Sequence, residues 1–319
     1  MSESADLDPA ALERELLGGE RRFTRLQVAE LSGVAIERCN ELWNALGFAD
    51  VADDVKAFTD RDVWALQTVD KLGSEGWLPD ELQVSMARAL GQSLSRLADW
   101  QLAAIGSMLD PALAQEQAMR RAQELVPVVE DLIGYVWRRH LAAVAGRVLA
   151  SSGEEFASGT LAVGFADLVG FTSLTREIGD AELGALVERF EGRASDVVAT
   201  GGGRVIKTIG DEVLFVADDV RTAAEIGMRL SEEVPDDSMP DLRVGLAFGT
   251  VLSRLGDVYG EPVNLASRLT SMARPGSVLV DREFAQALDG TDGWQLRRVP
   301  PRPARGYTML YPLRLRRSS

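Results

Sequence analysis

The chain has 319 residues, of which 46% are hydrophobic and 26% charged, so it is long and apolar enough to fold into two domains of ordinary size. This composition excludes a disordered or fibrous protein. The formal net charge of -15 at pH 7 opposes nonspecific attraction to nucleic acid or to anionic lipid.

The first residues, MSESADLDPA, are acidic and polar and do not have the pattern of a secretory signal. No uninterrupted apolar run approaches the roughly 20 residues that cross a bilayer. We therefore expect a soluble, cytoplasmic protein without a membrane partner. Cys39 is the only cysteine, which excludes an intrachain disulfide, and we expect it to be a small buried side chain.

From about Ala10 to Ala150, leucine, alanine and valine recur every three or four residues, a spacing that predicts helices. Between Phe23 and Gly47, two short amphipathic segments flank a Ser-Gly-Val turn at the spacing of a helix-turn-helix. This segment resembles the opening of MerR-like winged domains.

If this motif bound DNA, its second helix would present basic or amide side chains to the groove. The exposed face of that helix is instead mixed to acidic, with Glu37, Arg38, Asn40 and Glu41. We therefore favour a structural motif over a DNA-binding one.

Amphipathic segments continue from Leu78 to Trp137, and they fit either a bundle core or a bundle around an apolar cavity for a small lipid-like effector. A last, locally basic helix is predicted from Trp137 to about Ala150, where it could act as a lever between the two halves. It carries His140, the only histidine, which is either an ordinary surface residue or a proton sensor.

A polar stretch with two glycines, residues 151–159, indicates a linker. Alternating β and α patterns begin near Leu161. We therefore predict an all-helical regulatory domain over residues 1–150 and an α+β domain over residues 155–319.

The run Leu161 to Ala166 is typical of a buried strand, and Asp167 follows it directly. A helix is expected after Gly170, and the free N–H groups of Gly170, Phe171 and Thr172 would attract phosphate oxygens. Taken alone, Asp167 could equally be a plain helix-start residue.

Residues 204–209 and 213–217 are predicted to form two strands of a hairpin around Gly210, Asp211 and Glu212. If the hairpin pairs with the strand before Asp167, the carboxylates of Asp167 and Asp211 come together. Two such carboxylates can hold a pair of divalent ions, and oxygen ligands suit Mg²⁺ or Mn²⁺.

Four further polar residues in the same half of the chain are candidates for this site. Lys207 precedes Asp211 by four residues and could donate to a base or to a phosphate, or it could be a solvated strand lysine. Asp257 precedes a helix predicted from Glu261 to Met272, which carries Asn264 and Arg268 on one face. An amide and a guanidinium so placed could hold a ribose and a developing phosphate charge, or form a surface polar pair.

Three motifs, FADLVGFT, KTIGDE and DVYGEPVNLASR, together resemble the catalytic domain of class III nucleotidyl cyclases over about half of the chain, from Leu161 to about Leu315. The likeness is greatest to the actinobacterial branch with N-terminal regulatory domains. It implies a ferredoxin-like βαββαβ domain that works as a head-to-tail homodimer, with each active site shared between two chains.

The resemblance also implies a role for each matched residue. Asp167 and Asp211 of one chain would hold two ions of Mg²⁺ or Mn²⁺, while Lys207 and Asp257 of the other would recognise adenine, Asn264 would orient the ribose and Arg268 would stabilise the pentavalent phosphorane. Lysine can donate to the adenine ring and aspartate can accept from its amino group, whereas guanine inverts that polarity, so ATP is favoured over GTP.

A basic residue that holds the terminal phosphates is also implied by the resemblance. Arg297, Arg302 and Arg305 are all candidates, and Arg305 is preferred because it leads into the last strand-like run.

The sequence thus predicts an adenylate cyclase that converts ATP to 3′,5′-cyclic AMP and pyrophosphate under the control of a helical domain, which would sense a small apolar effector or a proton. The alternative is a catalytically silent cyclase-like module that binds nucleotide and controls a DNA-binding helix-turn-helix. The presence of all six matched polar residues favours the enzyme, and the acidic composition opposes DNA binding.

Overall fold

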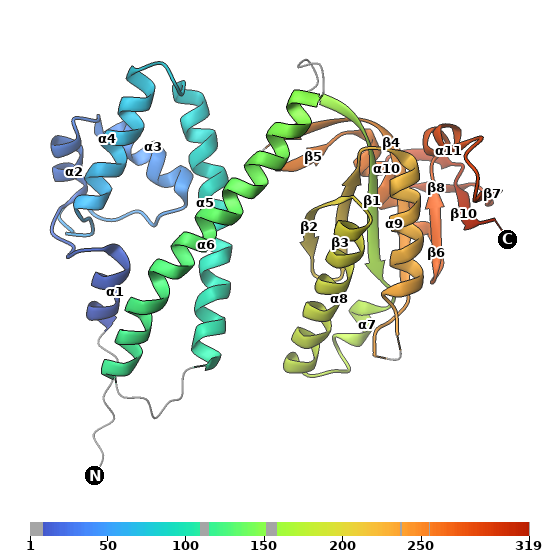
Figure 1. Cartoon of the computed structure of the whole chain (residues 1–319), viewed down its shortest axis with the longest axis horizontal. Coiled ribbons are helices and arrows are strands. Elements are labelled where there is room, and N and C mark those ends of the chain that lie inside the picture. Colours follow the sequence, from blue (N-terminus) through green and yellow to red (C-terminus); the bar gives the residue numbers. More distant parts are fainter. Residues whose placement is uncertain (1–8, 109–114, 151–157, 237, 255, 319) are drawn as a thin grey trace, which may run out of the picture. The chain divides into compact units, whose positions relative to one another are not determined.

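The computed structural model describes residues 9–108, 115–150, 158–236, 238–254 and 256–318 (Figure 1). The chain divides into two compact units, Met1–Arg147 and Val148–Ser319. Most of the predicted linker, residues 151–157, lies outside the described residues, and its last two residues begin the first strand of the second unit.

The first unit is helical, as predicted. Its elements are α1 (Pro9–Leu17), α2 (Arg25–Ser32), α3 (Ile36–Leu46), α4 (Asp60–Ser74), α5 (Asp80–Met108) and α6 (Gln115–Ala150). The expected helix-turn-helix consists of α2 and α3: Thr24 and Gln27 form a capping box at the start of α2, and Gly33 ends the helix with a φ of 76°.

The core of this unit forms around α3. Cys39 and Leu42 are buried there, and the ring of Trp43 stacks on that of Phe58 with 4.5 Å between centroids. Cys39 is buried as predicted, and this burial raises the pKa of its thiol. A thiol held in its protonated form is a poor nucleophile, which agrees with a packing role.

Arg38 on α3 is bound within the first unit. Its guanidinium donates to Glu41 Oε2 at 2.6 Å and to Gln83 Oε1 at 2.8 Å. The basic side chain that a groove-binding helix would present is therefore already used for packing α3 against α5, which supports a structural role for the motif.

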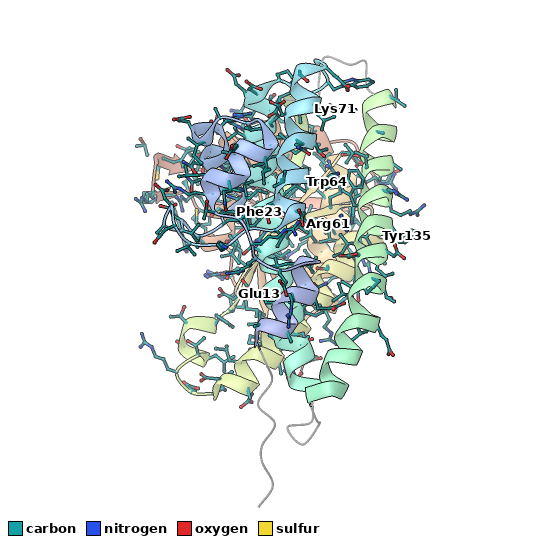
Figure 2. All side chains as sticks on the ribbon, turned by 90° about the vertical axis from the view of Figure 1, so that its left-hand side faces the viewer. Glu13, Phe23, Arg61, Trp64, Lys71 and Tyr135 are labelled. Carbon is teal, nitrogen blue, oxygen red and sulfur yellow. The ribbon has the colours of Figure 1, made fainter. Side chains whose placement is uncertain are left out.

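The long helix α6 corrects one prediction. It begins at Gln115, not at Trp137, and continues for 36 residues through Pro127. Its exposed side chains include His140 and the large apolar residues Tyr135 and Trp137. Trp64 of α4 is exposed as well, and Figure 2 labels both Trp64 and Tyr135. Exposed apolar side chains in such numbers are typical of interaction surfaces.

An effector cavity was one of two interpretations of the helical segments, and the small pocket beside α3 does not provide it. That pocket, lined by Trp43 and Phe58 among others, holds about 20 Å³, far below the roughly 300 Å³ of a small ligand site. Within the described residues, no helix is long and apolar enough to span a bilayer.

The second unit is built around a mixed sheet with the strand order β2-β3-β1-β4-β6-β10-β7, in which β5 pairs with β4. Its elements are β1 (Ser158–Leu168), α7 (Phe171–Leu174), α8 (Asp180–Thr200), β2 (Arg204–Ile209), β3 (Glu212–Ala217), α9 (Val220–Glu233), β4 (Leu242–Arg254), β5 (Asp257–Tyr259), α10 (Glu261–Met272), β6 (Ser277–Val280), α11 (Arg282–Leu288), β7 (Trp294–Arg298), β8 (Arg302–Ala304), β9 (Tyr307–Leu310) and β10 (Leu313–Arg317). The segment β1-α8-β2-β3-α9-β4 confirms the predicted βαββαβ core, and β6, β10 and β7 extend its β4 edge.

Helices cover both faces of this sheet. The helices α8, α9 and α11 close the larger core, which includes Phe190, Phe215 and Phe284. On the other face, α10 packs close to β4 because Gly245 has no side chain, and a Cβ at this position would lie 2.3 Å from the backbone nitrogen of Thr270. The α10 face therefore carries a helix pressed directly onto the centre of the sheet.

Candidate active site

Asp167 lies near the end of β1, in the middle of the sheet. It pairs with Glu212 on β3 and with Arg243 on β4, so all three side chains lie on the α10 face. The Asp167 side chain is buried, and Arg243 Nε donates to its Oδ2 at 2.5 Å. Burial raises the pKa of Asp167, and the Arg243 guanidinium opposes that rise.

Asp211 occupies the tight turn between β2 and β3, as predicted. Gly210 has a φ of 62°, and the backbone N–H of Leu168 donates to the Asp211 carbonyl at 3.0 Å, which ties the turn to the end of β1. The Asp211 carboxylate lies close enough to Asp167 to add to the rise in its pKa. The fold thus brings the two predicted carboxylates together.

Glu212 belongs to the same cluster, although the motif analysis gave it no role. Burial, followed by the negative charges of Asp167 and Asp211, raises the pKa of Glu212 from an ordinary 4.5 to about 7. Its place could have been inferred from strand alternation, because Glu212 shares a face with the buried residues Leu214 and Val216.

The three carboxylates of this cluster outnumber the single guanidinium of Arg243, so the cluster suits cations. Carboxylate oxygens are the ligands that Mg²⁺ and Mn²⁺ prefer, so the residues fit the two ions implied by the resemblance. Among the described residues, however, no group of three or more His, Cys, Asp or Glu side chains is arranged to hold a metal ion alone. Further ligands would have to come from water or from a phosphate.

Lys207 and Asp257 form an ion pair within one chain. The Lys207 Nζ lies 2.5 Å from Asp257 Oδ2, and the side chains are 36% and 24% exposed. A register shift in β2 between Val205 and Lys207 marks a bulge at this point, and such bulges redirect a side chain. The pair therefore offers a donor and an acceptor side by side on a partly buried surface.

Asn264 and Arg268 lie on α10, whose predicted bounds are confirmed. Asn264 is exposed and Arg268 is half-buried. Arg268 Nε donates to the backbone carbonyl of Arg305 at 3.2 Å, which links α10 to the turn between β8 and β9. Within the described residues its other N–H groups make no hydrogen bond, so they remain available to a ligand.

The remaining predicted residues are those at the start of α7 and the three candidate phosphate arginines. Gly170 has a φ of 77° and precedes α7, which has four residues, so the helix dipole there is small. Phe171 packs against the larger core, and Thr172 is exposed. Of the three candidate phosphate arginines, Arg297 and Arg302 line a cavity described below, and the Arg305 side chain is exposed outside its lining.

Comparisons with known proteins place these features in a family. Residues 155–311 match the family described as the adenylate and guanylate cyclase catalytic domain. A protein from Streptomyces coelicolor named adenylate cyclase is 49% identical over 293 residues, which cover 88% of this chain and 76% of that protein. An adenylate cyclase from Streptomyces griseus is 46% identical and is covered over 72% of its length. Among solved structures, the adenylyl cyclase CyaB from P. aeruginosa is 20% identical with a TM-score of 0.45, over 51% of this chain and 96% of that one.

The raised pKa of Glu212 leads to a pH-dependent stability. Between pH 4.5 and about 7 the folded state holds this proton while the unfolded state has lost it, so wild-type stability falls as the pH rises through this window. Because Glu212→Gln removes the ionisation, its melting temperature relative to wild type should increase from pH 5 to pH 8 in EDTA-containing buffer.

The matched control is Glu188→Gln, which changes an exposed glutamate on α8. Its melting temperature relative to wild type should stay constant over the same pH range. A Glu212→Gln difference that stays flat or shrinks with rising pH would contradict the electrostatic account of this edge.

Proposed function

The chain belongs to the adenylate and guanylate cyclase family, and we propose that it converts ATP to 3′,5′-cyclic AMP and pyrophosphate at a site shared by two copies of the chain. The observation that carries the choice of ATP is the contact between Lys207 and Asp257. The relatives named adenylate cyclase support the same choice.

The ion pair is suited to adenine in its observed geometry. An ammonium has three donors, so Lys207 can keep its bond to Asp257 and still donate to a ring nitrogen of the base. Asp257 Oδ1 already accepts from the backbone N–H of Val258 at 2.9 Å, which fixes the carboxylate for a further donor such as the adenine amino group. Guanine would place an oxygen against the carboxylate and leave buried groups unpaired.

At the other end of the substrate, Asp167 and Asp211 would hold two ions of Mg²⁺ or Mn²⁺, which when bound supply neutralisation of the triphosphate and activation of the 3′-hydroxyl. Arg243 opposes the effect of burial on the pKa of Asp167 and so favours the ionised form that a metal ligand requires. The backbone N–H groups of Gly170, Phe171 and Thr172 would contact phosphate oxygens, and Arg305 would contact the terminal phosphates.

Asn264 and Arg268 would act on the reacting atoms. The amide on the exposed face of α10 would orient the ribose, so that its 3′-oxygen lies in line with the α-phosphorus. Arg268 is held through Nε by the Arg305 carbonyl, which fixes the guanidinium while leaving its outer N–H groups for the charge that develops on the phosphorus.

We also propose that the first unit controls the second. A site assembled from two chains depends on their relative position to within about an ångström, so a helical unit that changes the dimer geometry changes the rate. The signal would be a small apolar effector or a proton, with His140 as the exposed candidate for the latter.

The base-recognition proposal predicts the effect of Asp257→Asn. Loss of a charge-assisted hydrogen bond should lower kcat/KM for ATP by about 10- to 100-fold and leave any GTP turnover almost unchanged, so the ATP preference falls. Cyclic nucleotide formation from both substrates with Mn²⁺ is the measurement. Asp218→Asn, which removes a surface partner of Arg204, is the control and should stay within about twofold. An unchanged ATP preference in Asp257→Asn would refute this role.

The shared site predicts complementation between two inactive variants. Asp211→Asn and Arg268→Ala chains should each be inactive alone, and mixing them should restore about a quarter of wild-type activity, because half of the dimers then contain one intact site of two. Refolding or co-expression of the two variants provides the mixture. Persistent inactivity of a mixture shown to contain heterodimers would place each complete site within one chain.

The regulatory proposal predicts that removal of residues 1–150 changes kcat by at least about fivefold, the lower range of a regulatory coupling energy. Turnover and sedimentation of residues 151–319 should be compared with those of the full chain at equal concentration. If rate and association state are both the same, the first unit does not control the second.

A further inference from the structure

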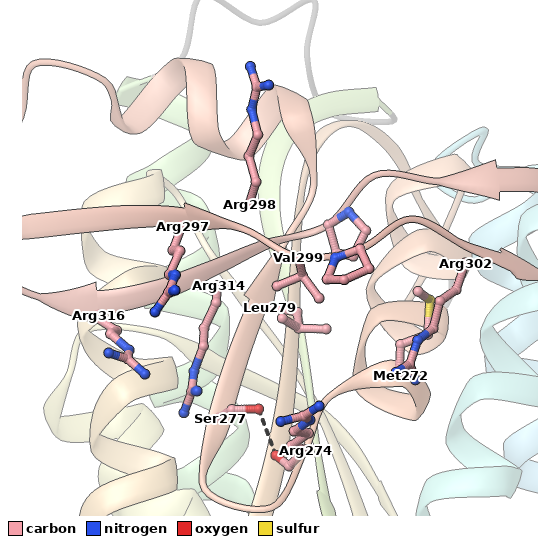
Figure 3. A pocket seen from close by; sticks show the side chains of 12 residues that line it. Met272, Arg274, Ser277, Leu279, Arg297, Arg298, Val299, Arg302, Arg314 and Arg316 are labelled. Atoms are coloured by element: carbon pink, nitrogen blue, oxygen red, sulfur yellow. Dashed lines mark hydrogen bonds between the residues drawn. The ribbon is translucent and has the colours of Figure 1, made fainter.

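A cavity of about 330 Å³ lies over the β6-β10-β7 side of the sheet in the second unit (Figure 3). Six arginines line it: Arg274, Arg297, Arg298, Arg302, Arg314 and Arg316. No aspartate or glutamate is among the lining residues. In a chain with a net charge of -15, this is a local reversal of sign. We call this group the arginine cavity.

The strand register explains how the arginines come together. Arg314 on β10 lies directly opposite Arg297 on β7 and opposite Leu279 on β6. Arg316 is two residues further along β10 and therefore shares this face. Figure 3 shows Arg297, Arg314 and Arg316 extending to the same side of the strands, with Arg274 near Ser277 below them and Arg298 extending the other way. The cluster is thus built by regular pairing of three strands.

The repulsion between these arginines lowers the stability of the folded protein. Like charges directly opposite on neighbouring strands repel, and none of the six arginines forms an ion pair with any residue in the described part of the chain. Arg314 is half-buried, and desolvation together with Arg316, Arg274 and Arg297 lowers its pKa. A ligand with several negative charges would relieve the repulsion that the fold itself leaves in place.

The cavity also has features that select among anions. Its guanidinium groups are planar donors that match phosphate oxygens two at a time. Leu279 and Val299 provide apolar surface beside them, and the volume is within the lower range of small-molecule sites. The Ser277 hydroxyl donates to the Arg274 carbonyl at 2.6 Å, which holds the loop between α10 and β6 at the rim.

We propose that the arginine cavity is a second ligand site, which binds a molecule or headgroup carrying two or more linked phosphates. It is separate from the candidate active site: four of its arginines, Arg274, Arg298, Arg314 and Arg316, were not among the candidates for the substrate phosphates, and Asp167 and Glu212 lie on β1 and β3, on the other side of β4. The proposal does not require the chain to be a cyclase.

The test is calorimetric titration of the full chain with inorganic pyrophosphate in EDTA, which removes metal-dependent binding at the acidic cluster. Wild type should bind pyrophosphate saturably and more tightly than orthophosphate. The double variant Arg274→Gln/Arg316→Gln removes two exposed guanidinium groups and should weaken binding by about tenfold or more. Its melting temperature without ligand should equal or exceed that of wild type, because repulsion has been relieved.

The matched control, Arg221→Gln/Arg282→Gln, makes the same change in net charge at exposed residues of α9 and α11 and should bind pyrophosphate within about twofold of wild type. Arg243→Gln, at the candidate active site, should also retain binding. Co-sedimentation with vesicles that contain a phosphoinositide, abolished by pyrophosphate and by the cavity variant, would identify a lipid headgroup as the source; its absence would identify a free oligophosphate.

Three results would overturn the proposal: no saturable binding of pyrophosphate by wild type, an equal loss in the control variant, or a parallel increase in the KM for ATP in the cavity variant. The last would assign these arginines to the phosphates of the substrate. Because binding is measured without turnover, a chain that proved inactive as a cyclase would leave the test intact.

Discussion

The register of β1 between β3 and β4 is the constraint on which the second unit depends. Val163 and Phe165 lie on the α10 face, and Ala162, Ala166 and Leu168 lie in the larger core on the other face. A slip of one residue would exchange the two sets and turn Asp167 into the apolar core, away from Arg243. The same alternation that packs the strand therefore fixes the position of the carboxylate.

The strands on the two sides of β4 also carry charges of opposite sign. On one side of β4, Asp167, Asp211 and Glu212 gather with a single guanidinium. On the other side, Arg297 of β7 and Arg314 and Arg316 of β10 form no ion pair with any described residue. In both clusters, residues that lie opposite each other on paired strands are joined by residues from turns and loops. The net charge of the chain reveals neither of them, because it averages over surfaces of opposite sign.

Turns and helices, whose stabilising contacts lie within a few residues of each other in the sequence, are predicted well. The turn at Gly210 and Asp211 and the helix from Glu261 to Met272 follow from turn chemistry and periodicity within a few residues. Strand alternation places Glu212 on the same face as Leu214 and Val216, but its neighbours Asp167 and Arg243 come from strands paired across the sheet, which no local pattern encodes. The predicted start of the last helix at Trp137 is wrong: α6 begins at Gln115 and continues through Pro127, although proline disfavours helix interiors.

The acidic cluster and the arginine cavity affect stability in the same way, although their charges have opposite signs. In each cluster, desolvation and then the neighbouring like charges disfavour the charged form of a side chain, Glu212 in one and Arg314 in the other. A ligand of opposite charge binds the folded chain but not the unfolded one, in which these strands are apart, and its binding free energy then adds to stability. The residues of the acidic cluster fit a divalent cation, and the ligand proposed for the arginine cavity is a linked phosphate.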